Sequence, residues 1–263
     1  MTRILFLGDI FGKPGRQAVR DLLPGLVGRE EIDLVLANGE NASGGLGLNP
    51  EEARELLDLG IAALTGGNHT FRYRSIEKMM DDDPRVLRPA NYPSPCPGRG
   101  WSLLETPGGI KVAVGNLMGR VFINLNLDCP FQAGDRLVKE MKEAGAQITI
   151  FDFHAEATSE KKALAWHLDG RAGAVVGTHT HVPTADAQIL PGGLAYMTDL
   201  GMCGPHQSII GMSRDSVLPT FLSGRPSRFE PAAKGARLNG AIIDFDLSGR
   251  ARAIKAVDLP GSR

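Results

Sequence analysis

Residues 147–181 read QITIFDFHAEATSEKKALAWHLDGRAGAVVGTHTH. This stretch begins with an apolar run at 147–154, continues with a segment of helical spacing at 158–168, and returns to an apolar run at 174–181. Short apolar runs are typical of buried strands when turn residues bound them. We therefore expect a strand, a helix that begins with Thr158 or Ser159 as its cap, and a second strand.

The same alternation of apolar and helical segments recurs along the chain. Further strands are predicted at 3–10, 33–39, 62–68 and 111–117, and further helices at 14–27, 50–59, 72–80 and 134–144. Such alternation predicts an α/β fold. Residues 240–259 differ, because their pattern predicts a β-hairpin that turns at Ser248–Gly249. We therefore expect two packed sheets with helices outside them.

The length of 263 residues fits one domain over 1–263. Proline, glycine and arginine are dense at about 84–110 and again at 203–236. We expect loop excursions there, because both stretches are longer than an ordinary connection between elements. Two interpretations stay open for them: surface or oligomer contacts, and a rim over a functional site.

Composition excludes several classes of protein. Hydrophobic residues make up 42% of the chain and charged residues 22%, which is inconsistent with disordered, collagen-like or coiled-coil proteins. A net charge of −1 gives no broad positive field for nucleic acid or an anionic membrane. Asp9 interrupts the first apolar run too early for a secretory signal, and no run approaches the ~20 residues of a membrane span.

The cysteines also favour a location in the cytoplasm. Cys96, Cys129 and Cys203 are odd in number and widely spaced, so they predict neither a disulfide framework nor a thiolate zinc site. We expect a cytoplasmic protein that forms a homo-oligomer and binds neither membrane nor nucleic acid.

Polar residues able to bind a metal occur where the predicted strands end. They are Asp9, Glu40, Asn41, Asn68, His154, His179 and His181. One such residue is usually a turn or capping residue, or a hydrogen-bonded core residue. Seven at five strand ends favour a site instead, because the carboxyl ends of parallel strands line one crevice.

The residue types predict the kind of metal site. His179 and His181 are two residues apart, so an extended backbone would point both to one face. Oxygen and nitrogen ligands without sulfur suit manganese, iron or zinc. Seven ligands exceed what one ion takes, so we predict two ions bridged by Glu40 and a hydroxide. The remaining positive charge favours a phosphate ester as substrate.

The motifs, in chain order, are GD at 8–9, GEN at 39–41, GGNH at 66–69, a histidine at 154 and GTHTH at 177–181. In this order they resemble the calcineurin-like metallophosphoesterases, in particular the YmdB-like branch of bacterial cyclic-nucleotide phosphodiesterases. The resemblance also covers the runs GDIFGKPGR, NGENASGG, YMTDLGMCGP and SRFEPA, and so nearly the whole chain. It implies a four-layer sandwich of two mixed β-sheets flanked by helices.

Three positions depart from the wider superfamily. Phe11 stands where the histidine of an Asp-x-His motif would fall, and the resemblance implies that Asn41 replaces that ligand. Glu40 takes the place of a bridging aspartate, and Thr70 that of an acidic residue after Asn-His. All three match the YmdB-like pattern.

The resemblance also implies a ligand set for each ion. One set is Asp9, Glu40, Asn41 and His181; the other is Glu40, Asn68, His154 and His179. His69 belongs to neither set, so we expect it to protonate the departing ribose oxygen as a general acid. The ions implied are two divalent or mixed-valence ions, iron or manganese, with zinc as the alternative.

The predicted function is that of a dinuclear metal-dependent phosphodiesterase that hydrolyses 2′,3′-cyclic nucleotides by in-line attack of the bridging hydroxide. A broad-specificity phosphatase or phosphodiesterase stays open, because the ligands define the chemistry and not the alcohol. A non-enzymatic, metal-stabilised regulator that binds a nucleotide is disfavoured by His69, which a binder does not need. A nuclease is disfavoured by the near-neutral charge.

Other candidates have simpler explanations. Asp152 lies two residues before His154 and is predicted to orient it, as metal-binding imidazoles require. His167 is predicted on a helix surface, and His206 lies in a glycine-rich loop without a spacing signal. Surface charge is favoured over phosphate contact for Arg16, Arg72 and Arg74.

Overall fold

The computed structural model describes residues 1–261. Its first sheet has the strand order β12-β11-β10-β1-β2-β3, with a further pairing of β11 to β1. The strands are β1 (Thr2–Ile10), β2 (Leu34–Asn38), β3 (Ala63–Thr65), β10 (Met202–Pro205), β11 (Ala236–Phe245) and β12 (Ala251–Pro260). β1 pairs in parallel with β2 and β10 but antiparallel with β11, so the sheet is mixed.

The second sheet has the order β4-β5-β6-β7-β9-β8. Its strands are β4 (Trp101–Glu105), β5 (Lys111–Met118), β6 (Ile148–His154), β7 (Ala174–Thr178), β8 (Gln188–Ile189) and β9 (Ala195–Met197). β5, β6, β7 and β9 are parallel, and an antiparallel strand closes each edge.

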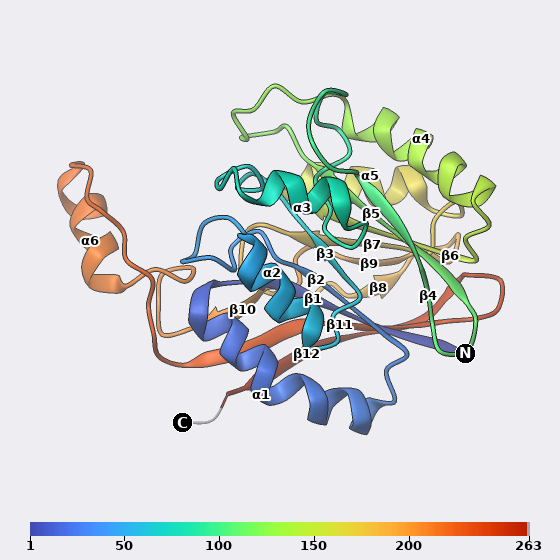
Figure 1. Cartoon of the computed structure of the whole chain (residues 1–263), viewed down its shortest axis with the longest axis horizontal. Helices are drawn as coiled ribbons and strands as arrows, with labels where there is room; N and C mark the ends of the chain where they lie inside the picture. Colours follow the sequence, from blue (N-terminus) through green and yellow to red (C-terminus); the bar gives the residue numbers. More distant parts are fainter. Residues whose placement is uncertain (262–263) are drawn as a thin grey trace.

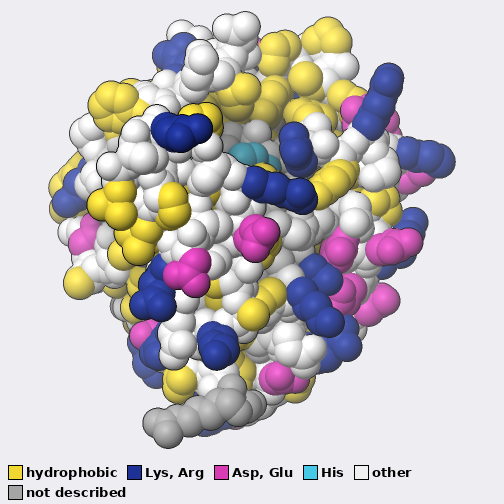
Figure 2. All heavy atoms as spheres, turned by 90° about the vertical axis from the view of Figure 1, so that its left-hand side faces the viewer, with side chains coloured by type: hydrophobic (Ala, Val, Ile, Leu, Met, Phe, Trp, Pro, Cys, Tyr) yellow, Lys and Arg dark blue, Asp and Glu magenta, His cyan; other side chains and the backbone are white. Residues whose placement is uncertain are grey.

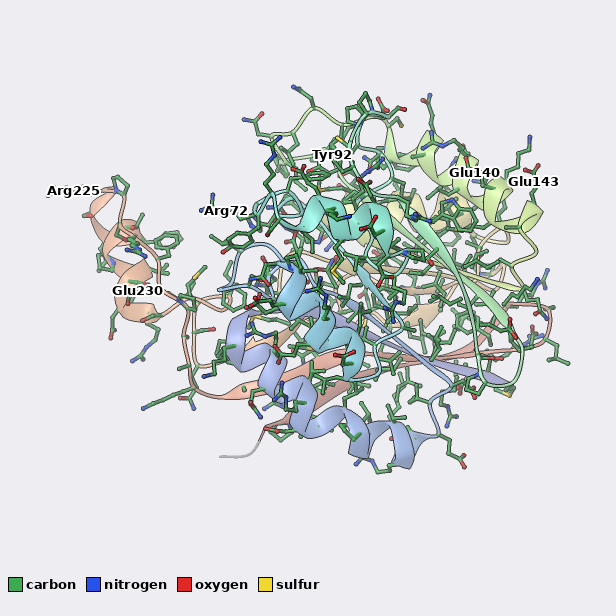
Figure 3. All side chains as sticks on the ribbon, viewed as in Figure 1. Arg72, Tyr92, Glu140, Glu143, Arg225 and Glu230 are labelled. Atoms are coloured by element: carbon green, nitrogen blue, oxygen red, sulfur yellow. The ribbon has the colours of Figure 1, made fainter. Side chains whose placement is uncertain are left out.

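Helices cover the outer faces of both sheets (Figure 1). On the first sheet lie α1 (Gly12–Glu30), α2 (Pro50–Asp58) and α3 (Ile76–Asp82), and on the second lie α4 (Pro130–Glu143) and α5 (Thr158–Leu168). α6 (Arg214–Ser223) stands apart from the sandwich, together with Arg225 and Glu230 (Figure 3). Among the described residues, no helix is long and apolar enough to cross a membrane.

Burial on both faces explains the continuous apolar strands. In β1, Ile4 and Phe6 pack between the sheets, whereas Leu5 and Leu7 pack against the helices. A strand covered on both faces reads as an unbroken apolar run instead of an alternating one. The four layers predicted from the resemblance are thus confirmed: helices, sheet, sheet, helices.

Several sequence predictions need correction. β4 lies inside the predicted loop excursion at 84–110, and α6 inside that at 203–236. α3 begins at Ile76 and not at 72, because turns occupy the preceding residues. Neither Thr158 nor Ser159 caps α5; the cap position is Ala157, without a side-chain hydrogen bond.

The predicted C-terminal hairpin is confirmed, since β11 and β12 pair antiparallel across a turn at 246–250. It extends the first sheet, where the start of β1 pairs along β11.

Candidate metal centre

Polar strand ends from both sheets meet at one end of the sandwich. Asp9 in β1 is in register with Asn38 at the end of β2, and in the second sheet His154 is in register with Thr178. The Asn38 amide bridges the sheets, because its Nδ2 donates to Asp152 Oδ2 over 2.9 Å. The crevice lies where the strand ends of the two sheets meet.

His154 lies at the middle of one group of ligand atoms. Its Nε2 is 3.1 Å from Glu40 Oε1, 2.9 Å from Asn68 Oδ1 and 3.0 Å from His179 Nδ1. Atoms of Glu40, His154 and His179 all lie within 4.8 Å of one another. This group contains every member of one predicted ligand set.

The second group lies on the other side of Glu40. Asn41 Nδ2 is 3.2 Å from Glu40 Oε1 and 3.0 Å from His181 Nε2. His181 Nε2 is in turn 3.8 Å from Asp9 Oδ1. The structure thus brings together all seven predicted residues, in two groups that share Glu40.

A chain of buried hydrogen bonds sets the orientation of the His154 ring. Thr178 donates its one hydroxyl proton to Asp152 Oδ1 over 2.7 Å, so its oxygen can only accept from His154 Nδ1, 2.9 Å away. Nδ1 therefore carries a proton, and Nε2 is left to take either a second proton or a cation. The predicted orienting role of Asp152 is indirect and passes through Thr178.

Similar bonds orient the other two histidines. His181 Nδ1 lies 2.9 Å from the carbonyl oxygen of Ile210, which can only accept, so Nε2 faces the site with its lone pair. His179 Nε2 lies 3.1 Å from Glu156 Oε2, so Nδ1 faces His154. In each case one ring nitrogen is held by the protein and the other points inward, as is usual for metal-ligating histidines.

These atoms fit a cation. His154 Nε2, His179 Nδ1, Glu40 Oε1 and Asn68 Oδ1 converge, and each of the four has a lone pair for a cation once His154 gives up its second proton. Asp9 Oδ1 is buried and has no hydrogen-bond partner among the described residues. A buried carboxylate oxygen without a partner is costly unless a positive charge satisfies it.

The pKa values of His154 and Glu40 show the same attraction for positive charge. Burial works against the charged form of His154, but Glu40 and Asp9 outweigh it and raise its pKa to about 9. Burial likewise acts to raise the pKa of Glu40, yet His154 holds that pKa at about 2. Burial and the neighbouring His154 lower the pKa of His179 to about 3. A bound metal ion would displace the second proton of His154, since ligands must be deprotonated, whereas His179 is already neutral near pH 7.

The backbone of the GTHTH segment differs from the extended one that we expected. β7 ends at Thr178, and both His179 (φ 101°) and His181 (φ 66°) lie in the left-handed region. The period-two explanation for their common direction was therefore wrong. The turn instead points one ring toward His154 and the other toward Asn41.

Two neighbouring residues shape the site without being ligands. Phe11 packs edge-on against the His181 ring, with ring centroids 5.7 Å apart, where a histidine ligand would otherwise stand. Thr70 accepts from Gly67 N over 2.9 Å and donates to Gly67 O over 2.8 Å, so it closes the GGNH turn. A Cβ on Gly67 would collide with Glu40 Oε2 and with the His154 ring, so only glycine fits there.

His69 is half-buried beside the ligands. Its backbone N–H donates to Glu40 Oε2 over 2.9 Å, and its Nε2 accepts from Asn68 Nδ2 over 3.1 Å, which leaves the ring proton on Nδ1. Burial lowers the His69 pKa. Figure 2 shows a histidine at the bottom of a hollow with basic side chains at its rim.

The remaining candidates lie elsewhere or are occupied. His167 lies on the surface of α5, as predicted, and its Nε2 contacts Asp135 Oδ1. His206 Nε2 contacts the Met202 carbonyl. Arg16 pairs with Glu55, whereas Arg74 is almost fully exposed.

Four contacts of the site have no signal in the sequence. They are the hydroxyl of Thr178, the carboxylate of Glu156, the carbonyl of Ile210, and a buried Lys161–Asp199 ion pair behind the GTHTH turn. The run YMTDLG, which contains Asp199, was a part of the resemblance but had no assigned role. Each contact depends on tertiary structure and not on spacing.

The chain is similar to known proteins over nearly its whole length. The family described as YmdB-like protein matches residues 5–257. A relative from Bacillus subtilis (strain 168), named 2′,3′-cyclic-nucleotide 2′-phosphodiesterase, is 46% identical over 93% of this chain and 91% of its own. A relative from Mycoplasma genitalium, named putative phosphatase/phosphodiesterase, is 36% identical over 92% of this chain and 87% of its own.

The chain is also similar to solved structures over nearly its whole length. A hypothetical protein from Thermus thermophilus matches with a TM-score of 0.92 and 43% identity over 99% of this chain and 100% of its own. A protein from Mycoplasma pneumoniae described as a novel phosphatase matches with a TM-score of 0.91 and 33% identity, over 98% of this chain and 93% of its own. A 5′-nucleotidase precursor from Thermus thermophilus shares the fold at 15% identity and a TM-score of 0.57, over 98% of this chain and 54% of its own.

Proposed function

The chain belongs to the YmdB-like family and is a phosphoric ester hydrolase, and on this premise we propose that it is a dinuclear metal-dependent phosphodiesterase acting on 2′,3′-cyclic nucleotides. The observation that carries the proposal is the convergence of Glu40, Asn68, His154 and His179 atoms on one side of Glu40, with His181 Nε2 and Asp9 Oδ1 on the other. Asp9 Oδ1 is buried and has no hydrogen-bond partner among the described residues. The name of the Bacillus subtilis relative supports the substrate class.

Seven side chains would hold the two ions. One ion is assigned to Asp9, Glu40, Asn41 and His181, and the other to Glu40, Asn68, His154 and His179. When bound, the ions supply positive charge that polarises the phosphoryl group and makes water a stronger nucleophile near neutral pH. Oxygen and nitrogen ligands without sulfur favour iron or manganese.

The protein itself positions the reacting groups. Thr178, Ile210 and Glu156 each hold one nitrogen of a ligand histidine, so the inward nitrogens are fixed before an ion or substrate arrives. Such fixed groups need no rearrangement as charge develops in the transition state.

His69 is assigned the role of general acid. Glu40 holds its backbone, and the Asn68 amide contacts its Nε2. To act as the acid the ring has to be doubly protonated; it would then pass its Nδ1 proton to the departing ribose oxygen and return to the neutral form. A positioned general acid contributes roughly 10²–10⁴-fold to the rate.

A second candidate is a phosphomonoesterase of broad specificity. The descriptions of the Mycoplasma relatives as phosphatases favour it, and the same ligands would serve it. A location in the cytoplasm, a homo-oligomeric state and the single domain stay predictions.

The test is a comparison of substrates. Manganese-loaded protein is assayed on 2′,3′-cyclic nucleotides, 3′,5′-cyclic nucleotides and nucleoside monophosphates, with the products identified. We expect the highest kcat/KM on 2′,3′-cyclic nucleotides. A higher kcat/KM on monoesters than on any diester would replace the proposal with the phosphatase. His179→Ala should lose this activity, and His167→Ala, a change of the surface histidine, is the matched control.

A further inference from the structure

A buried ion pair lies directly behind the turn that carries His179 and His181. Lys161 Nζ, from α5, donates to Asp199 Oδ2 over 2.8 Å, and the two side chains are 1% and 0% exposed. A buried ion pair often adds little to stability, because removing two charges from water costs as much as their attraction returns. Stability alone is therefore a weak explanation for it.

The turn itself completes the hydrogen bonding of Asp199. Thr180 N donates to Asp199 Oδ2 over 3.0 Å, and Gly201 N donates to Oδ1 over 2.9 Å. Thr180 is the residue between the two histidines. The carboxylate, in the segment after β9, thus ties the middle of the turn to α5 through Lys161, and Gly201 N closes a local turn onto it.

The turn needs such a tie because its backbone is strained on both sides of Thr180. His179 and His181 have φ angles of 101° and 66°, a region that residues with a Cβ rarely adopt. Strained backbone persists only where surrounding contacts hold it. Here the contacts are the Thr180–Asp199 bond and a bond from His179 N to Asp9 Oδ2 over 3.1 Å.

Gly177, the first residue of GTHTH, lets the lysine reach Asp199. A Cβ on Gly177 would lie 3.0 Å from Lys161 Cδ and would collide with the Thr198 carbonyl. The aliphatic stem of Lys161 therefore passes close over the backbone of Gly177. The glycine, the lysine and the aspartate form one packed unit.

We propose that the Lys161–Asp199 pair is a positioning device that holds the strained turn so that His179 and His181 meet two different ions at the same time. The inference rests on the proposed dinuclear function. Asp199 fixes Thr180, and Lys161 keeps the Asp199 carboxylate compensated and directed at the turn. Neither side chain belongs to the assigned ligand sets.

The first measurement is hydrogen exchange of the metal-free protein in the segment 179–181. We expect Lys161→Met and Asp199→Asn to speed exchange there at least tenfold, while exchange in β1 is unchanged. The exposed neighbour variant Lys162→Met is the matched control and should behave as wild type. Asp199→Asn preserves volume and keeps the test available if Lys161→Met does not fold.

The second measurement is calorimetric titration of the same proteins with Mn²⁺. We expect both ions to bind roughly 10–100-fold more weakly in the two variants, the range found when outer-shell partners of metal ligands are changed. A core variant on α4, Val138→Ala, selected for a similar fall in Tm, should bind both ions as wild type does. That comparison separates positioning from general loss of stability.

The outcomes are distinguishable. Unchanged exchange at 179–181, or faster exchange with unchanged Mn²⁺ affinity, overturns the positioning role. If wild type binds fewer than two Mn²⁺ ions, the proposed dinuclear function fails instead, and the exchange data still decide whether the pair holds the turn.

Discussion

His154 and the pair His179 and His181 reach the same centre by different routes. His154 is the last residue of β6, in register with Met118 and Thr178 of the neighbouring strands, so the sheet itself places it. His179 and His181 follow the end of β7 on left-handed backbone, and distant groups place them. A ligand at a strand end is thus set by local pattern, whereas a ligand on a turn depends on the rest of the fold.

The largest expected effect is the loss of a ligand on either route. His154→Ala and His181→Ala should each reduce metal content by about one ion per chain, and by different ions, because they are assigned to different sets. Activity should fall by about 10²–10³ or more, since groups that stabilise developing charge are removed. Elemental analysis and kcat measure both, with His167→Ala as the control. Equal loss of the same ion in both variants would contradict the assignment.

His69 lies beside the ligand residues Glu40 and Asn68 but belongs to neither ligand set. His69→Ala should keep metal content and lower kcat by roughly 10²–10⁴ for ribosyl leaving groups, because they need a proton to depart. Esters of p-nitrophenol should lose much less, since their oxygen leaves without one. The measurement is the ratio of wild-type to variant kcat for the two substrates at equal metal occupancy. Equal losses would refute the general-acid role, and loss of metal would make His69 a ligand.

Substitution of the residues that hydrogen-bond the ligand histidines tests whether the strand-end ligand or the turn ligand is more sensitive to its partner. Thr178→Val cuts the buried chain from Asp152 to His154, and Glu156→Gln weakens the half-exposed partner of His179. Both should weaken Mn²⁺ binding, within roughly 10–100-fold for such partners. Thr178→Val should weaken it more, because water screens the Glu156 contact. Calorimetric titration decides, and the reverse order would show that the turn is the more sensitive route.

The smallest effect on activity is expected from substitution of Arg72, an exposed residue near His69. Arg72 lies near His69, and among the described residues it has no carboxylate within ion-pair distance (Figure 3). Arg72→Ala should raise KM about two- to fivefold with kcat unchanged, since an exposed charge contact contributes about 1 kcal/mol or less. Arg74→Ala, at a residue 94% exposed, is the control. An unchanged KM would show that Arg72 is an ordinary surface charge and does not contact the substrate.

The sequence predicted what periodicity and strand ends control. The continuous apolar runs predicted β1 and β6, and the residues after them predicted the seven side chains that the structure brings together. The ligand roles themselves stay predictions. Family resemblance predicted the four layers, which the fold confirms.

Contacts between distant residues could not be predicted in this way. Nothing local shows that β7 ends at Thr178, that Glu156 turns back to His179, or that Lys161 pairs with Asp199. β4 was missed because proline and glycine surround it, and its partner β5 fixes it as an edge strand.

Anomalous X-ray diffraction from crystals of the manganese-loaded protein decides whether two ions share Glu40. We predict two manganese peaks per chain, one among Asp9, Asn41 and His181 and the other among Asn68, His154 and His179, with Glu40 between them. A single fully occupied peak, with either group of side chains left without an ion, would contradict the dinuclear site.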